Sequence, residues 1–139
     1  MPSHEVTSST HIAEPADLVW SKLRDFHGLW HPSIDTMAVE HDDKGGLLRA
    51  FTVKNEKTLY REKLTWFSDS ERSMAYTHVQ GIAGVEHYDA RLELTATDRD
   101  DVLIRLSAHL EASEPRATQI AMGTQSIFDS AIASIESLD

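Results

Sequence analysis

Hydrophobic residues near the C-terminal end of the chain recur at steps of three and four residues, which is the spacing of an amphipathic α-helix. They are Ile120, Ile127, Phe128, Ala131, Ile132, Ile135 and Leu138. We therefore predict a long helix over Glu114 to Asp139, with Pro115 in its first turn. A helix with a single apolar face is not stable alone in water, so the rest of the chain has to supply the surface that it covers.

Most of the preceding chain alternates between apolar and polar residues at two-residue steps, which is typical of half-buried β-strands. The predicted strands are Glu5–Ile12, Ile34–His41, Leu47–Val53, Thr58–Phe67, Ser73–Gln80, Glu86–Thr97 and Val102–Ala112. Short polar turns, such as Asp42–Gly46, separate most of these strands. Short connections between consecutive strands indicate an antiparallel meander.

The segment between the first two strands has helical character. Pro15 and Asp17 suit a helix start, and an apolar stripe follows at Leu18, Val19, Leu23 and Phe26. Gly28 interrupts this stripe and Pro32 ends it. We predict two short helices after the first strand. For the second, over Phe26–His31, a turn is the alternative. The fold class is therefore α+β, and we expect residues 1–139 to form one domain.

Alternation also assigns the strand faces. It directs Tyr88, Ala90, Leu92 and Leu94, together with Val102, Ile104, Leu106, Ala108 and Leu110, toward the long helix. On two neighbouring strands it places Arg49 beside Phe51, and Glu62 beside Tyr60, Leu64 and Trp66, on inward faces. A buried charge without a partner costs several kcal/mol. Three readings stay open: a structural ion pair, a slipped register with both residues in solvent, or a polar spot in an apolar ligand pocket.

Composition narrows the classes of partner. The 139 residues include 13 basic and 23 acidic residues, for a net charge of −10. Such a chain repels nucleic acid and anionic lipid, so we expect neither nucleic acid nor membrane as a partner. The absence of cysteine excludes disulfides, thiol catalysis and zinc–thiolate sites. The polar N-terminus has no signal-peptide core, and we expect a cytoplasmic location.

Several short motifs, in their order and spacing, resemble the START/Bet v 1-like (SRPBCC) superfamily, polyketide cyclase/dehydrase type. The motifs are Ala13–Trp20, Phe26–Pro32, Gly46–Arg49, Tyr60–Leu64, Ser73–Tyr76, Tyr88–Ala90 and Leu106–Ala108. The resemblance implies a helix-grip fold, in which a curved seven-stranded antiparallel sheet wraps around a long C-terminal helix and leaves a cavity between them. It extends over nearly the whole chain, from about Glu5 to Leu138.

The family includes aromatic-polyketide cyclases, plant abscisic-acid receptors, lipid carriers and lachrymatory-factor synthase. Local similarity is greatest to the last of these, in which an arginine after the glycine turn and a glutamate in the next strand act on a small sulfur compound. Arg49 and Glu62 occupy those motif positions. If Glu62 is enclosed, we expect it to shuttle protons and Arg49 to hold a developing oxyanion, such as the enolate of a polyketide.

We expect the cavity wall to contain one further set of residues from the sheet, the loop before Pro32 and the helix. These ligand-binding candidates are Trp30, Phe51, Tyr60, Leu64, Tyr76, His78, Tyr88, Leu106 and Phe128. His78 is either a second acid–base group or a solvent-facing residue at a strand end. His27 and His31 have a metal-clip spacing only within a helix, which Gly28 and Pro32 oppose, so we expect no metal.

These expectations lead to two main functions. The first is binding of a small hydrophobic or polyketide-like ligand in the cavity between sheet and helix. The alternative is a cyclase, dehydratase or isomerase that uses Arg49 and Glu62 and requires no cofactor. A third reading is an interaction protein whose loops at Gly81–Gly84 and Lys54–Lys57 close over a ligand. The sequence leaves open whether a reaction is catalysed and whether the chain forms a homodimer.

Overall fold

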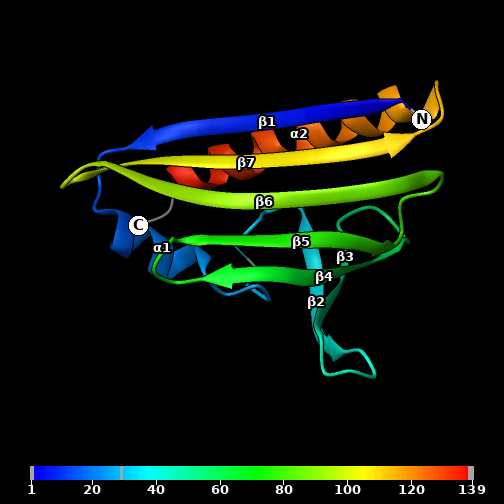
Figure 1. The fold of residues 1–139 in the computed structure, drawn as a ribbon, viewed down its shortest axis with the longest axis horizontal. Helices are drawn as coiled ribbons and strands as arrows, with labels where there is room; N and C mark the ends of the chain where they lie inside the picture. Colours follow the sequence, from blue (N-terminus) through cyan, green and yellow to red (C-terminus); the bar gives the residue numbers. More distant parts are fainter. Residues whose placement is uncertain (1, 29, 138–139) are drawn as a thin grey trace.

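The computed structural model describes residues 2–28 and 30–137. In chain order its elements are β1 (Ser3–Ile12), α1 (Ala16–Leu23), β2 (Ile34–His41), β3 (Leu47–Val53), β4 (Leu59–Ser68), β5 (Ser73–Gln80), β6 (Val85–Asp98), β7 (Asp101–Ala112) and α2 (Arg116–Glu136) (Figure 1). The seven strands form one sheet in the order β1-β7-β6-β5-β4-β3-β2. All neighbouring strands are antiparallel, so the predicted meander is confirmed, with β1 added beside β7.

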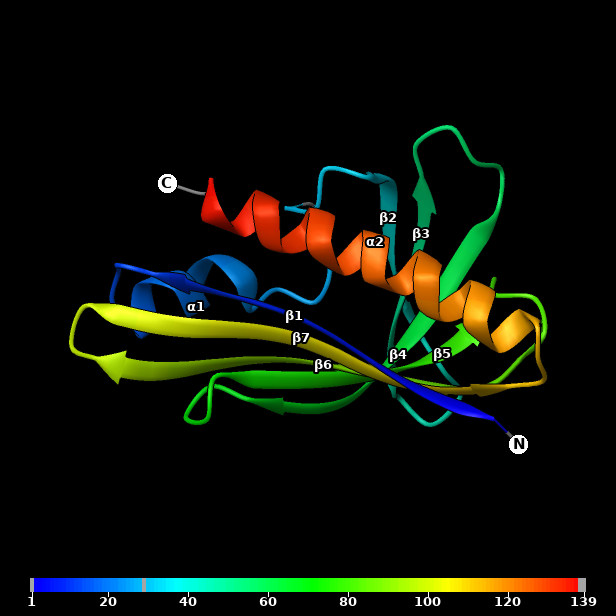
Figure 2. The same ribbon diagram turned by 90° about the horizontal axis from the view of Figure 1, so that it is seen from above.

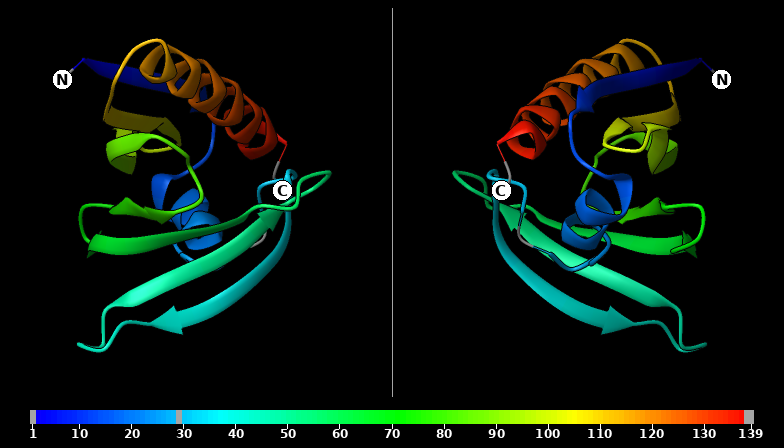
Figure 3. Two further views of the ribbon diagram at one scale, coloured as in Figure 1. Left: turned by 90° about the vertical axis from the view of Figure 1, so that its right-hand side faces the viewer. Right: turned by 90° about the vertical axis from the view of Figure 1, so that its left-hand side faces the viewer.

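The sheet curves around α2, which confirms the helix-grip arrangement. The helix packs on β1, β7 and β6. The strands β2 and β3 turn away from the plane of β6 and β7 and cross behind the helix (Figures 2 and 3). The helix therefore covers one half of the concave face closely, while the other half bends away from it. Neither described helix is long and apolar enough to cross a membrane.

The first helix begins where the sequence predicts. The carbonyl of Pro15 accepts hydrogen bonds from the backbone N–H groups of Leu18 (3.1 Å) and Val19 (3.2 Å). The buried side of α1 consists of Ala16, Val19, Trp20 and Leu23. Leu18, which the sequence pattern placed on this stripe, is 46% exposed because it points away from these four positions at 100° per residue.

The second of the two short helices is not formed among the described residues, where turns follow α1. The backbone N–H of Gly28 donates to the Asp25 carbonyl (3.0 Å), and the N–H of His27 donates to Asp25 Oδ1 (2.9 Å). These bonds close a tight turn instead of continuing a helical ladder. The alternative prediction of a turn at this place is the one that the structure supports.

The filled half of the concave face is the hydrophobic core. The inward residues predicted on β6 and β7 are all buried, and Val102, Ile104 and Leu110 have no exposed surface. The buried stripe of α2 is Ala117, Ile120, Thr124, Phe128, Ala131, Ile132 and Ile135. Ile127 was predicted on this stripe but is 52% exposed, because it lies at the edge of the stripe. Leu138, also predicted there, lies outside the described residues.

Trp66 is a second correction. The predicted inward set on β4 included Trp66, but its side chain is 44% exposed. The register of β4 against β5 shifts between Leu64 and Trp66, and one extra residue reverses the alternation beyond that point. Phe67 takes the inner face instead, with its ring 5.7 Å from that of Trp20. The indole of Trp66 donates a hydrogen bond to Ser73 Oγ (3.0 Å).

Candidate ligand cavity

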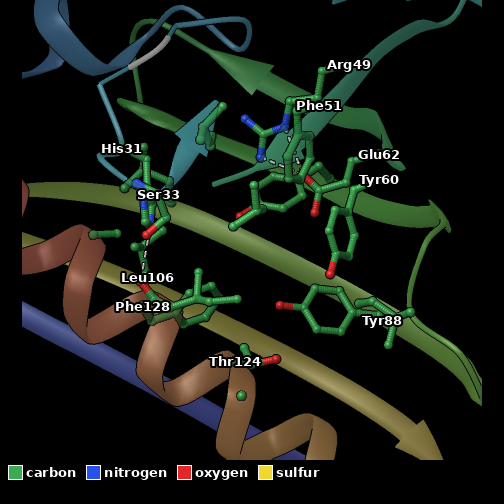
Figure 4. Close-up of a pocket in the computed structure, with 18 of the residues that line it drawn as sticks. His31, Ser33, Arg49, Phe51, Tyr60, Glu62, Tyr88, Leu106, Thr124 and Phe128 are labelled. Atoms are coloured by element: carbon green, nitrogen blue, oxygen red, sulfur yellow. Dashed lines mark hydrogen bonds and ion pairs between the residues drawn. The ribbon is translucent and has the colours of Figure 1, made fainter. Parts of the chain in front are cut away.

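A cavity of about 450 Å³ lies between the sheet and α2. Its wall comes from β3 to β7, from the segment after α1 and from the side of α2 that carries Gln119, Gly123 and Ile127 (Figure 4). The space exists because β2 to β4 bend away from the helix, so their inward side chains do not reach it. The volume falls within the range of small-molecule sites.

The structure brings most of the predicted ligand-binding residues together at this cavity. Seven of the nine line it: Trp30, Phe51, Tyr60, Tyr76, Tyr88, Leu106 and Phe128. Leu64 and His78 do not. Leu64 packs against the hydrophobic core beside the cavity. His78 is the register partner of Glu62 on the neighbouring strand, and its ring lies edge-on to that of Tyr88, at 6.5 Å between ring centroids. Burial lowers the pKa of His78, and the Glu62 carboxylate opposes this.

Arg49 and Glu62 face each other in register on β3 and β4 and both line the cavity. Glu62 Oε1 accepts from Arg49 Nε at 2.8 Å and lies 2.7 Å from Arg49 Nη2. Arg49 Nη1 donates to the Phe26 carbonyl at 2.9 Å. The two side chains are only 16% and 13% exposed. The slipped-register reading is therefore wrong, while the ion pair and the polar spot in an apolar pocket describe the same feature.

Aromatic rings surround the guanidinium. The centre of the Arg49 guanidinium lies 4.3 Å from the ring centroid of Phe26, 4.5 Å from that of Tyr76 and 5.7 Å from that of Phe51. Burial lowers the pKa of Arg49, but Glu62 and Tyr76 more than offset this, so the pKa is raised and the charge is kept. Burial and then the Glu62 carboxylate raise the pKa of Tyr76 to about 12, so this phenol stays a hydrogen-bond donor near neutral pH.

The second carboxylate oxygen of Glu62 faces the cavity. Both contacts from Arg49 reach Oε1, and no hydrogen bond from the residues that the structure describes reaches Oε2. Because Glu62 lines the cavity, a molecule inside it can approach Oε2. The arrangement holds a carboxylate rigidly through one oxygen and presents the other as an acceptor or base.

Three hydroxyl groups form a second polar region. The hydroxyls of Tyr60 and Tyr88 point into the space between sheet and helix, and Thr124 of α2 lies across from Tyr88 (Figure 4). Burial raises the pKa of the Tyr88 phenol, while a hydrogen bond with Thr124 opposes this. Burial and then Glu56, whose Oε1 accepts from the Tyr60 hydroxyl at 2.7 Å, raise the pKa of Tyr60 to about 12. Both phenols therefore stay protonated at neutral pH.

His31 connects the loop before β2 to α2 through a hydrogen bond. Its Nε2 lies 3.2 Å from the Ile127 carbonyl, and its Nδ1 accepts from the backbone N–H of Ser33 at 3.0 Å. Burial lowers the pKa of His31, which agrees with a neutral ring whose two nitrogens are both engaged. His27 bonds the Leu48 carbonyl through Nε2 at 2.9 Å. Each of these histidines therefore bonds to a backbone carbonyl through Nε2.

Of the α2 residues that line the cavity, sequence reasoning named only Phe128 as a cavity residue, and Gly123 and Thr124 are the two missed positions with a recognisable signal. A Cβ atom added to Gly123 would meet nothing within 4 Å. The available signal was a glycine and a threonine within an otherwise apolar helical stripe, with Thr124 four residues from both Ile120 and Phe128. Both positions mark where the helix leaves room instead of filling it.

Residues 3–137 match the model of a protein family described as polyketide cyclase / dehydrase and lipid transport. No curated protein matches the chain in sequence, so the local similarity to lachrymatory-factor synthase stays a prediction from its motifs.

Solved structures resemble the chain over nearly its full length. The Zhui aromatase/cyclase from a Streptomyces species has a TM-score of 0.83 at 14% identity, over 97% of this chain and 92% of that one. A protein from Thermobifida fusca has a TM-score of 0.81 at 21% identity, over 95% and 90%. Norcoclaurine synthase from Thalictrum flavum, in complex with dopamine and hydroxybenzaldehyde, has a TM-score of 0.76 at 17% identity, over 97% and 85%. At these identities the likeness establishes the fold.

Proposed function

The chain belongs to the polyketide cyclase / dehydrase and lipid transport family, and from this premise we propose that it binds a small hydrophobic or polyketide-like molecule in the cavity between sheet and helix. The observation that carries the proposal is a hollow of about 450 Å³ that is walled mainly by aromatic and aliphatic side chains and contains one enclosed ion pair. Apolar walls supply affinity, and a few placed polar groups orient the ligand.

The side chains on the two sides of the cavity support this function. Phe51 and Tyr60 are partners on neighbouring strands, stack with their ring centroids 5.4 Å apart and line one side of the cavity. Phe128 and Leu106 lie on the opposite side of the cavity (Figure 4). Aromatic rings therefore line both sides of the cavity, which suits a ligand with an aromatic or unsaturated ring. We further propose that the ligand is the main partner and that one START/Bet v 1-like domain in the cytoplasm is the functional unit.

Titration with the neutral fluorophore N-phenyl-naphthylamine tests the binding function. We expect saturable binding at one site. The variant Gly123→Phe places a ring in the cavity and should weaken binding about tenfold or more. Met122→Phe is the matched control, because Met122 is 69% exposed and should leave binding unchanged. Absence of binding to the wild-type protein, or binding that Gly123→Phe leaves unaltered, would overturn the proposal.

Catalysis is the second candidate, and the open Oε2 of Glu62 favours it. A base at this position accepts a proton from a carbon next to a ligand carbonyl, and the electron pair moves to the carbonyl oxygen as an enolate. Before the transfer, Arg49 and Glu62 neutralise each other. After it, Glu62 is neutral, and the charge of Arg49 balances that of the enolate. Protonation of Glu62 therefore unmasks the positive charge of Arg49 at the moment when the enolate forms.

The enolisation step is measurable without knowledge of the natural substrate. In deuterated water, the wild-type protein should accelerate exchange of the acidic carbon-bound hydrogens of β-tetralone, as followed by NMR. Glu62→Gln should abolish this acceleration while the fluorophore still binds, and Glu40→Gln, on the outer face of the sheet, should retain it. If wild-type protein and buffer give equal exchange rates, the protein is a binder without this chemistry.

A further inference from the structure

The charged side chains on the cavity wall differ in how freely a ligand can contact them. Three carboxylates line the cavity, Asp25, Glu56 and Glu62, against two guanidinium groups, Arg49 and Arg116. A ligand in this space meets at least as much negative as positive charge. The sign of the charge that remains accessible therefore depends on which of these groups already have partners.

Arg49 has little capacity left for an anion. Two of its nitrogens contact Glu62 Oε1, the third donates to the Phe26 carbonyl, and aromatic rings pack around the guanidinium. Arg116 lines the cavity near enough to Tyr60 for its charge to oppose the rise in the pKa of that phenol, and its Nε donates to the Ala83 carbonyl at 2.7 Å in an exposed contact. Water and salt screen a guanidinium at such a rim far more than one inside the cavity.

We propose, on the basis of the binding function proposed above, that the cavity selects a neutral ligand whose hydroxyl or enol group donates a hydrogen bond to Glu62 Oε2, and that it excludes carboxylates. A ligand carboxylate beside Oε2 meets a like charge and loses its hydration without gaining a free cation. A phenol or enol instead gives Oε2 the donor that it lacks and keeps the Arg49–Glu62 pair intact.

The hydroxyl cluster extends the same selection. Tyr60, Tyr88 and Thr124 are neutral hydroxyl groups; Tyr60 already donates to Glu56 and can accept from a ligand, while a hydroxyl group in general both donates and accepts hydrogen bonds. They lie toward the helix from Glu62 (Figure 4), so a ligand anchored at Oε2 places further oxygen atoms near them. The selected class is therefore a neutral molecule that carries a hydroxyl or enol group, rather than a free fatty or aromatic acid.

Three probes of nearly equal size test the proposal near neutral pH: β-naphthol, its methyl ether β-methoxynaphthalene, and β-naphthoate. By calorimetry or competition with the fluorophore, β-naphthol should bind about tenfold more tightly than either of the others. The ether lacks the donor for Oε2, and the naphthoate carries the disfavoured charge. Equal affinity for β-naphthol and β-naphthoate would overturn the proposal.

Charge removal at Glu62 should reverse the preference. In Glu62→Gln the charge of Arg49 is no longer balanced, so β-naphthoate should gain about tenfold or more in affinity and β-naphthol should lose. Glu40→Gln is the matched control, because Glu40 pairs with Arg61 outside the cavity (2.8 Å). A naphthoate affinity that stays the same in Glu62→Gln contradicts the proposal.

Two further outcomes are distinguishable. If none of the probes binds, the binding function itself fails, whereas tight binding of all three overturns only the selection. Naphthoate binding that Arg116→Gln abolishes would place the anion at the rim and overturn the exclusion.

Should Glu62→Gln fail to fold, the wild-type protein still tests the proposal. The apparent Kd of β-naphthoate should rise about tenfold per pH unit above the pKa of the acid, since only the neutral acid enters the cavity.

Discussion

Two arginine–glutamate pairs lie on opposite faces of the same part of the sheet. Arg49 and Glu62 meet on the concave face, and Arg61 and Glu40 meet on the convex face. The Nε to Oε1 distance is 2.8 Å in both pairs. The inner side chains are 16% and 13% exposed, and the outer ones 29% and 36%. The two pairs have the same chemistry and differ in surroundings.

The difference shows how location determines what an ion pair can do. On the convex face, water solvates both partners, so either charge can be lost at little cost. In the hollow, each charge depends on the other because aromatic rings replace water around Arg49. Only the inner pair can transmit a change in one partner to a bound molecule. Substitutions in the two pairs should therefore differ in their effect on stability.

Loss of one inner partner should cost the most. Glu62→Gln should lower the free energy of unfolding by about 3 kcal/mol, because it leaves the Arg49 charge enclosed beside a neutral amide. Glu40→Gln, the matched outer change, should lower it by only a small part of that amount. Urea denaturation measures both. Equal losses in the two variants would show that the surroundings do not distinguish the pairs.

Replacement of both inner charges should be milder than replacement of one. The double variant Arg49→Met with Glu62→Leu should unfold within about 1 kcal/mol of the wild-type protein, because apolar side chains of similar volume suit an enclosed site. The same denaturation series tests this. If the double variant is as unstable as Glu62→Gln alone, then the geometry of the pair, and not an unbalanced charge, stabilises the fold.

Because the space beside Gly123 is open, an alanine at this position should stabilise the fold. Gly123→Ala adds a methyl group where no atom lies within 4 Å. It should raise the free energy of unfolding by about 1 kcal/mol, which is the difference in helix propensity between the two residues. Met122→Ala, at the exposed neighbouring position, is the control and should have little effect. A loss of stability in Gly123→Ala would mean that the space is filled.

The convex face should show the smallest effect, and only in acid. A hydrogen bond from Lys63, and then those from the backbone N–H groups of Gly46 and Lys44, lower the pKa of Asp42 to about 2. Because its pKa is lower in the folded than in the unfolded state, Asp42 stabilises the fold above its ordinary pKa and loses this contribution as the pH falls toward about 2.

The comparison of wild type with Asp42→Asn over this acid range isolates the contribution of Asp42. The stability difference between the two proteins should shrink as the pH falls. A difference that stays constant with pH would indicate that Asp42 does not titrate with folding.

The faces of most strand residues could be predicted from the sequence, because successive side chains on a strand point to opposite sides. This rule placed Arg49 and Glu62 inward, and the structure places them there. The rule fails where the register shifts, as at Trp66, because one unpaired residue reverses every face beyond it. No local signal in the chain marks that shift.

Local periodicity and short turns were sufficient to predict the order of the elements, the antiparallel meander, the covering helix and the inward direction of the two charges. The bend of one half of the sheet away from the helix is visible in the folded structure and not in the sequence pattern. That bend leaves a cavity of about 450 Å³, with Glu62 Oε2 facing the space and with Leu64 and His78 outside the lining. Alternation specifies a direction for each side chain, whereas the distance to the opposite layer depends on the curvature of all seven strands together.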